Sequence, residues 1–176
     1  MEKEKNEFWE WLKIIITAAV VTALIRHFLF TPIIVDGESM LPTLEDRDRM
    51  IVNKFAYRIG KPERFDIIVF KAEENKDYIK RIIGLPGEHI EYKDDVLYIN
   101  GIPYDEPFLE EQKALYGGTT FTQPFADYVP EGHVYVLGDN RPHSKDSRHI
   151  GPIPIEDIMG KATLIFWPPS DFQFIH

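Results

Sequence analysis

The N-terminal part of the chain contains an apolar run that does not suit an amphipathic surface helix. Residues 11–30 read WLKIIITAAVVTALIRHFLF, and the twelve residues from Ile14 to Ile25 carry no charge. No polar stripe runs through them, whereas a helix packed on a soluble core keeps one polar face. A membrane span needs roughly 20 residues, and Lys13 and Arg26 supply the missing length by extending toward opposite interfaces. The run therefore predicts a membrane anchor helix over residues 11–30.

Charges around this run indicate whether it is a cleavable signal peptide and how it is oriented in the membrane. Four glutamates within the first ten residues do not suit the basic start of a cleavable signal peptide. Lys3, Lys5 and Lys13 precede the uncharged residues 14–25, and only Arg26 follows them closely. Positive charges favour the cytoplasmic side of a membrane. We therefore expect a single-pass protein of the cell membrane with residues 1–10 in the cytoplasm. Residues 31–176 would form the main domain on the outer face, in contact with the lipid bilayer.

Short apolar runs, mostly separated by Gly, Pro or charged residues, predict that this domain is mainly β. Asn100-Gly101 joins two such runs and is typical of a two-residue hairpin turn. Residues 106–132 have few periodic apolar positions, so we expect an inserted hairpin or loop lobe at about 96–132. The strands are expected at residues 33–35, 50–55, 66–71, 78–84, 89–92, 96–100, 133–138 and 162–167.

Composition excludes several classes of function. The net charge is -9, with 29 acidic and 20 basic residues, and an acidic surface repels nucleic-acid phosphates. Cysteine is absent, which excludes thiol catalysis, cysteine-ligated zinc and disulfides. His143, Asp146 and His149 suggest a metal site, but they lie in a turn-rich loop without close repeat ligand spacing. We expect no metal and no other cofactor.

The segment DGESMLPTL, residues 36–44, places a serine in a Gly-containing bend after an apolar run. Asp, Gly and Ser are ordinary turn residues and Pro42 restricts Leu41, so an ordinary turn explains the segment as well. The alternative is that the bend presents Ser39 as a nucleophile, which needs a base elsewhere in the chain.

The segment YIKRIIG, residues 78–84, offers such a base. Side chains alternate along a strand, so Tyr78, Lys80 and Ile82 share one face. On an edge strand the lysine would extend into water. If both faces are covered, burial lowers its pKa and leaves a neutral amine that activates a hydroxyl.

A third segment, GDNRPHSKDSR at residues 138–148, combines turn residues, hydroxyls and opposite charges. Many such segments are solvated loops. Others fix catalytic groups through hydrogen bonds and an Asp–Arg pair.

Together these segments resemble the motifs of one family. GESMLPTL (37–44), FDIIVFK (65–71), YIKRIIGLPGE (78–88) and GDNRPHSKDSRHIG (138–151) occur in the order found in bacterial type I signal peptidases with one N-terminal anchor. The resemblance extends from the anchor to Trp167. It implies a signal-peptidase-like β-barrel core with a small inserted lobe, preceded by one transmembrane helix.

The resemblance also implies an activity and its residues. The protein would be a membrane-bound serine endopeptidase that removes signal peptides from exported preproteins, with Ser39 as nucleophile and Lys80 as general base. In the family pattern Ser144 hydrogen-bonds the lysine, while Asp146 and Arg148 pair and hold their loop. The protein-export machinery and signal peptides would be its partners, and no cofactor is implied.

Two further expectations concern substrate contacts. The Ser39 N–H would donate to the oxyanion, but Gly37 stands where many relatives from double-membrane bacteria carry a hydroxyl, so that second donor is missing. The peptide would be cut after a small-x-small sequence and would bind by strand addition beside residues 32–36. By family position, its pockets would be lined by Ile33, Val35, Met40, Leu44, Tyr78 and Ile79.

Two alternatives remain open at this level. One is a serine–lysine autoprotease like the self-cleaving repressors, although an apolar anchor replaces their DNA-binding module. The other is a catalytically silent, membrane-anchored binding protein on the same scaffold. Loss of cleavage in a folded Ser39→Ala variant separates enzyme from binder.

Overall fold

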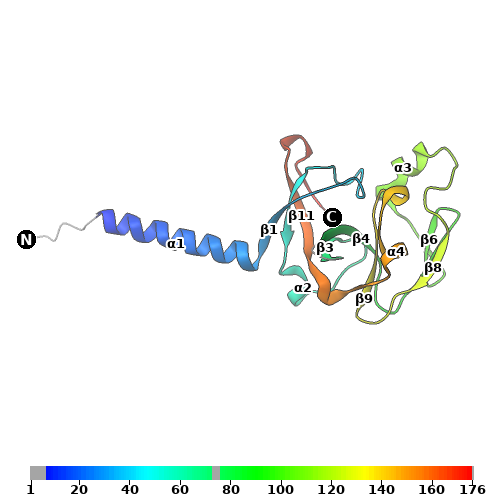
Figure 1. Cartoon of the computed structure of the whole chain (residues 1–176), viewed down its shortest axis with the longest axis horizontal. Coiled ribbons are helices and arrows are strands. Elements are labelled where there is room, and N and C mark those ends of the chain that lie inside the picture. Colours follow the sequence, from blue (N-terminus) through cyan, green and yellow to red (C-terminus); the bar gives the residue numbers. More distant parts are fainter. Residues whose placement is uncertain (1–6, 73–75, 176) are drawn as a thin grey trace, which may run out of the picture.

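The N-terminal helix stands apart from the β domain. The computed structural model describes residues 7–72 and 76–175. Helix α1 (Glu7–Phe28) projects from the domain as a single long rod (Figure 1). Its window from Glu7 to Ile25 is long and apolar enough to cross a membrane, and none of it is buried against the domain. An exposed apolar helix of this kind is consistent with a membrane anchor, and it begins four residues before the expected position 11.

Beyond α1 the domain contains two antiparallel sheets that lie side by side (Figure 1). The larger sheet has the order β1-β2-β11-β3-β4-β9-β10, and β12 pairs with β11. Its strands are β1 (Phe30–Ile34), β2 (Arg49–Asn53), β3 (Ile67–Lys71), β4 (Asp77–Gly84), β9 (His133–Leu137), β10 (Ile153–Pro154), β11 (Ile158–Trp167) and β12 (Gln173–Phe174).

The smaller sheet forms a lobe inserted between β4 and β9, in the order β7-β6-β5-β8. Its strands are β5 (His89–Lys93), β6 (Val96–Ile99), β7 (Ile102–Tyr104) and β8 (Phe125–Tyr128). Short α-helices are α2 (Ala56–Ile59), α3 (Glu110–Leu115) and α4 (Ser147–Ile150), and 3-10 helices are η1 (Pro107–Leu109), η2 (Arg141–His143), η3 (Ile155–Asp157) and η4 (Pro169–Asp171).

The mainly β architecture with one N-terminal apolar helix confirms the predicted fold class, with two differences. All eight expected strands are present, but the larger sheet is not a closed barrel among the described residues, because its path ends at β1 and at β10. The second sheet begins at His89, so the inserted lobe includes β5 and starts before residue 96. Alternating apolar residues indicate strands, but they do not determine whether the outermost strands meet.

Strand β4 has its two faces covered by different apolar clusters, and this decides the environment of its basic residues. Ile82 packs with Phe70 and Val136, whereas Ile83 packs with residues of the smaller sheet. The strand is exposed or half-buried over its first three residues and buried from Lys80 onward. Both cations of the YIKR segment are therefore inside the protein, and each needs a compensating partner or a shifted pKa.

Candidate active site

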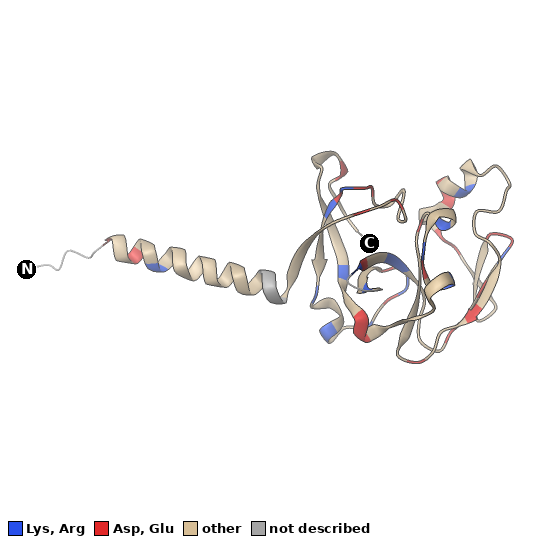
Figure 2. Cartoon of the chain, in the orientation of Figure 1, with Lys and Arg blue, Asp and Glu red and all other residues tan. Residues whose placement is uncertain are grey.

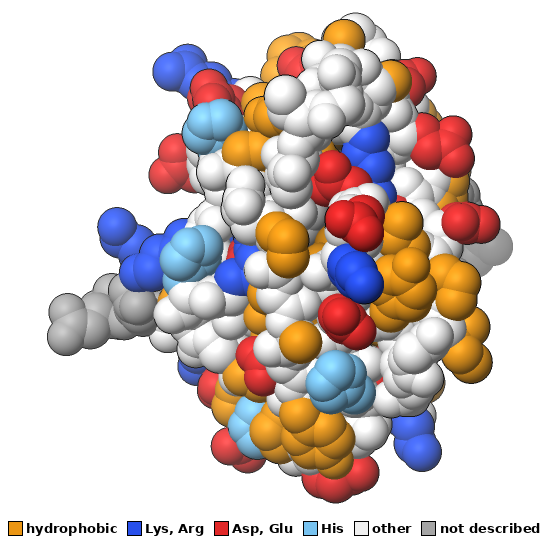
Figure 3. Space-filling view, turned by 90° about the vertical axis from the view of Figure 1, so that its right-hand side faces the viewer, with side chains coloured by type: hydrophobic (Ala, Val, Ile, Leu, Met, Phe, Trp, Pro, Cys, Tyr) orange, Lys and Arg blue, Asp and Glu red, His pale blue; other side chains and the backbone are white. Residues whose placement is uncertain are grey.

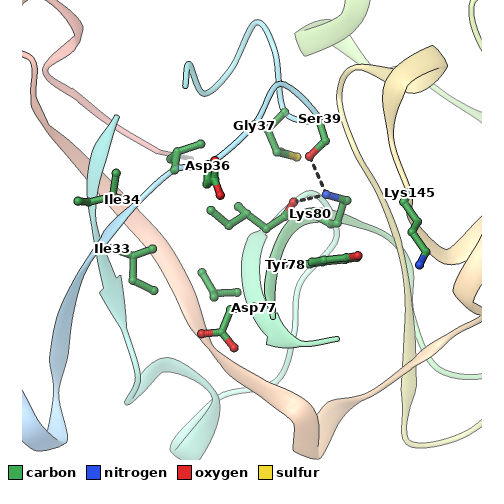
Figure 4. A pocket seen from close by; sticks show the side chains of 13 residues that line it. Ile33, Ile34, Asp36, Gly37, Ser39, Asp77, Tyr78, Lys80 and Lys145 are labelled. Atoms are coloured by element: carbon green, nitrogen blue, oxygen red, sulfur yellow. Dashed lines mark hydrogen bonds between the residues drawn. The ribbon is translucent and has the colours of Figure 1, made fainter. Parts of the chain in front are cut away.

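The serine of the bend and the lysine of β4 are in direct contact. Lys80 Nζ lies 2.7 Å from Ser39 Oγ and 2.9 Å from the carbonyl oxygen of Ile79 (Figure 4). Only 4% of Lys80 is exposed, so the edge-strand alternative, in which the amine reaches water, is wrong. The two side chains form a hydroxyl–amine pair of the kind that the sequence predicted.

Burial is also the main cause of an altered lysine pKa. Desolvation lowers the pKa of Lys80 from 10.5 to about 8, while the carboxylates of Asp146 and Asp139 oppose this shift by favouring the charged amine. A substantial share of Lys80 is therefore neutral at mildly alkaline pH. A neutral amine in hydrogen-bond contact with a hydroxyl has the geometry and the pKa of a general base.

The loop that carries Ser39 is fixed by apolar packing and by hydrogen bonds from Asn140. Met40 and Leu44 are buried in the apolar cluster under the loop, and the Leu44 N–H donates to the Met40 carbonyl at 3.0 Å. The backbone N–H of Asn140 donates to the Ser39 carbonyl, and the side-chain amide of Asn140 donates to the Glu38 carbonyl. The bend is thus a rigid support for the serine rather than an ordinary exposed turn.

Gly138 allows the segments of Ser39 and Ser144 to approach closely. A Cβ atom at this position would lie 2.3 Å from Ser144 Oγ and 2.4 Å from the Ser39 carbonyl oxygen, closer than any real contact. The expected hydrogen bond from Ser144 to Lys80 is absent, since Ser144 Oγ is buried without a partner among the described residues. The Lys80 amine bonds to Ser39 and to the Ile79 carbonyl instead.

Asp146 and Arg148 form the expected ion pair. Arg148 donates from Nε to Asp146 Oδ1 and from Nη2 to Asp146 Oδ2, both at 2.8 Å. Asp146 also accepts from the Gly138 N–H at 3.1 Å and caps the start of α4. Because its carboxylate holds Gly138 as well as Arg148, the pair fixes the loop beside the serine.

A second buried ion pair was not predicted. Arg81 donates to Asp139 through Nε at 2.9 Å and through Nη2 at 2.7 Å, and both side chains are almost fully buried. Thr43 of the serine loop donates to the same carboxylate at 2.5 Å. Asp139 therefore joins β4 to the loop of Ser39. A buried arginine requires such a carboxylate, but the sequence does not say which of the acidic residues supplies it.

The inserted lobe contacts this region through a third buried pair. Arg141 donates to Glu106 Oε1 at 2.5 Å and to the Tyr92 hydroxyl, and neither Arg141 nor Glu106 has an exposed side chain. The Arg141 Nε donates to the Gly138 carbonyl at 3.0 Å. The lobe thereby supports the peptide unit that lies against Ser39 and Ser144.

A cleft of about 360 Å³ opens beside the hydroxyl–amine pair (Figure 4). Five of the six residues predicted to contact substrate line this cleft, whereas Leu44 is fully buried under the loop, anchors it and does not line the cleft. The cleft also contains Val69, Asp77 and Lys145, which the sequence did not predict, and Ile34 and Asp36, which lie within the predicted peptide-binding segment 32–36. The cleft is lined by Ile33, Ile34, Val35, Asp36, Gly37, Ser39, Met40, Val69, Asp77, Tyr78, Ile79, Lys80 and Lys145.

Open strand edges border this cleft. Strand β1 pairs only with β2, and β4 pairs with β9 only from Arg81 onward, which leaves one edge of residues 77–80 open in the described part of the chain. Unpaired N–H and C=O groups along two edges can accept an extended peptide as an added strand.

Potential metal ligands do not gather in the described residues, where no three His, Asp or Glu side chains come together. Both Asp146 oxygens are occupied by Arg148, and His149 Nδ1 lies 4.0 Å from Asp146 Oδ1. Of the three residues considered as ligands in the sequence, Asp146 is used in an ion pair and His149 lies beside it, whereas His143 Nδ1 lies 3.3 Å from Asn140 Oδ1.

A serine hydroxyl bonded to a buried lysine amine beside a cleft is the arrangement that a serine hydrolase with a lysine base requires. The chain belongs to the signal peptidase family, peptidase S26, whose model matches residues 8–167. It is 46% identical to signal peptidase I of Bacillus caldolyticus, with 98% of this chain and 97% of the relative covered. It is 41% identical to signal peptidase IB of Staphylococcus aureus strain MRSA252, with 97% and 95% covered.

A solved structure supports the same assignment. The crystal structure of a signal peptidase I from Enterococcus faecalis V583 matches with a TM-score of 0.56 and 43% identity, and the match covers 58% of this chain and 97% of that chain. Family membership decides in favour of a signal peptidase over a self-cleaving repressor.

Proposed function

We propose that Ser39 and Lys80 perform the hydrolysis by which this member of the signal peptidase family removes signal peptides from exported preproteins. The observation that carries the proposal is the 2.7 Å contact between Lys80 Nζ and Ser39 Oγ inside a largely buried site. An amine whose pKa is lowered to about 8 accepts the serine proton, which an ordinary surface lysine does not do near neutral pH.

The reaction needs two proton transfers in each half. As Ser39 Oγ attacks the carbonyl carbon of the scissile bond, Lys80 takes its proton and then donates it to the leaving amine. The C–N bond breaks and an ester to Ser39 remains. Water then attacks the ester, Lys80 takes the water proton and returns it to Ser39, and the signal peptide leaves with a new carboxylate. Asp146 and Asp139 favour the ammonium form of Lys80 that arises in each half.

Oxyanion stabilisation is expected from the backbone N–H of Ser39. Gly37 supplies no side-chain donor, and its own N–H donates to Asp46 Oδ1 at 2.9 Å. In this conformation a second donor is therefore another backbone amide or a water molecule.

Substrate selection follows from the shape of the cleft. An extended peptide between the open edges of β1 and β4 points alternate side chains toward the cleft wall. Ile33, Tyr78 and Ile79 present apolar surface there above the buried side chains of Val35 and Met40, and this surface accepts a methyl group and excludes larger side chains. We therefore propose cleavage after small-x-small sequences of the Ala-x-Ala kind.

For its location, we propose that α1 crosses the cell membrane with residues 1–10 in the cytoplasm and the β domain on the outer face. Trp167, Phe172 and Phe174 are each at least half exposed near the C-terminal end of the domain, and aromatic rings of this kind suit a lipid interface. Contact with the protein-export machinery belongs to the same proposal, because exported preproteins reach this face through it.

The direct test uses the full-length protein in detergent with a preprotein, followed by mass measurement of the new N-terminus. We expect one cut after a small-x-small sequence, and no cut by a folded Ser39→Ala variant. Cleavage by Ser39→Ala would refute the proposed nucleophile. Binding without cleavage by the wild-type protein would instead support the catalytically silent alternative.

A further inference from the structure

Few ionisable side chains line the cleft, and Asp77 is one of them. Most of its lining is apolar or backbone, and besides Lys80 the ionisable side chains are Asp36, Asp77 and Lys145, together with the phenol of Tyr78. Asp77 is the exposed first residue of β4 and forms no ion pair within the part of the chain that the structure describes. Figure 4 shows its carboxylate at the end of the cleft away from Ser39.

Strand geometry relates Asp77 to the bond that is cut. Asp77 precedes Lys80 by three residues on β4, which corresponds to roughly 10 Å at about 3.3 Å per residue. An extended peptide beside the strand advances at the same rate. If small residues before the scissile bond occupy the wall near Lys80, the next residues upstream reach Asp77. These are about the fourth to sixth residues before the bond.

A substrate charge at this point interacts with the carboxylate across a partly apolar cleft. Water screens an exposed pair, but the cleft walls of Ile33 and Ile79 exclude water from one side, so screening is incomplete. An acidic substrate residue is then repelled and a basic one attracted, which changes the affinity for productive binding.

We infer that Asp77 is a specificity-determining residue, which selects against acidic and in favour of basic side chains four to six residues before the cleaved bond. This inference rests on the proposed function, because it requires a signal peptide to lie along β4 with its cleavable bond at Ser39.

The test uses synthetic peptides with one Ala-x-Ala site that differ only in carrying Lys, Gln or Glu at the fourth, fifth or sixth residue before the bond. They are cleaved by the full-length wild-type protein, by Asp77→Asn and Asp77→Lys, and by Asp94→Asn as a matched control. Asp94 is exposed in the β5–β6 turn, where Asn tolerates the positive φ of 50° equally well.

At low ionic strength we expect the wild-type ratio of kcat/KM for Lys over Glu to be about 3 to 10 at one position, as single exposed charge pairs allow. The ratio should fall to about 1 in Asp77→Asn, invert in Asp77→Lys and stay unchanged in Asp94→Asn. It should also shrink in 0.5 M salt.

Equal ratios in the wild-type and both Asp77 variants would overturn the inference and leave the proposed function intact, provided that the Gln peptide is cleaved by the wild-type and not by Ser39→Ala. Failure of the wild-type protein to cleave the Gln peptide would overturn both. Circular dichroism and thermal melting of the Asp77 variants, compared with wild-type, rule out a folding defect as the cause of a changed ratio.

Discussion

Lys80 Nζ and Ser39 Oγ lie 2.7 Å apart, although 41 residues separate them in the chain. Their contact does not depend on these two side chains alone. Asp139 bonds Arg81, the neighbour of Lys80, and also Thr43, which lies in the loop of Ser39. A single buried carboxylate therefore joins the strand of the proposed base to the loop of the proposed nucleophile.

Replacing Lys80 by arginine should abolish cleavage while preserving the fold. Arginine has a pKa above about 12, so it stays protonated and does not accept the serine proton. We expect at least a thousandfold loss of kcat/KM, since removing a catalytic base and misplacing the hydroxyl act together. Circular dichroism and thermal melting serve as controls. Near-wild-type activity in the folded variant would assign the base to another group.

The pH profile should show the titration of the same lysine. Only neutral Lys80 accepts a proton, so kcat/KM should rise with pH and level off above about 8, well below the ordinary lysine value of 10.5. The folded pKa is lower than the unfolded one, so the unfolded chain binds more protons between about 8 and 10.5. Lys80 therefore makes the free energy of unfolding increase with pH between about 8 and 10.5. A kinetic pKa near 10.5 would contradict the buried-amine explanation.

Gly138→Ala should impair both stability and activity. The added methyl would sit 2.3 Å from Ser144 Oγ and 2.4 Å from the Ser39 carbonyl, so one of the two segments has to move. Overpacking of this kind typically costs about 1–3 kcal/mol, and the displaced serine should lower kcat more than it changes KM. Unfolding in denaturant and steady-state kinetics measure the two effects. Wild-type values for both would show that the backbone has more freedom here than the structure indicates.

Glu106→Gln tests whether the inserted lobe supports the catalytic loop. The substitution leaves the Arg141 guanidinium fully buried without its carboxylate, which typically destabilises a protein by about 3–5 kcal/mol. Chemical denaturation of this variant should be compared with Glu111→Gln, an equal charge change at an exposed position of α3. Equal midpoints for the two variants would mean that the pair contributes nothing to the support.

Removal of α1 should separate membrane attachment from catalysis. A chain that begins near Phe30 keeps β1 and the whole cleft, and it should be more soluble than the full-length protein while still cleaving short peptides. Sedimentation with vesicles measures residual lipid contact through the C-terminal aromatic residues. Recovery of the full-length protein in the soluble fraction without detergent would contradict the anchor assignment.

The sequence predicted the elements and the reactive pair more completely than their surroundings. A lysine in the apolar run of β4 and a serine in a Gly-containing bend are local patterns, and the family resemblance implies the roles proposed for them. Leu44 illustrates the limit: the sequence gives its apolar character but not whether it faces the cleft or the core beneath it. Ser144 illustrates a second limit. Whether it bonds the Lys80 amine depends on the other acceptors near that amine, which here bonds to Ser39 and to the Ile79 carbonyl.

Long-range pairing of charges was also beyond local patterns. The burial of Arg81 follows from its place in an apolar run, but its partner Asp139 lies 58 residues away. Arg141 and Glu106 are joined across the boundary of the inserted lobe, which no periodicity describes. The charged positions coloured on the ribbon in Figure 2 likewise show no pattern that distinguishes these structural pairs from solvated charges, and Figure 3 shows acidic and basic side chains interspersed over the lobe face.

The junction between α1 and β1 gives the proposed anchor a further role. The helix ends at Phe28 and the strand begins at Phe30, so Ile33 on the cleft wall is only five residues from the end of the helix. Five residues span at most roughly 18 Å even when fully extended. With α1 in the bilayer, the short junction fixes the height of the cleft above the membrane surface. The protein reaches only those bonds that lie within a short, fixed height of the membrane surface, so both the position of a cut and the side-chain sizes around it would decide which preproteins mature.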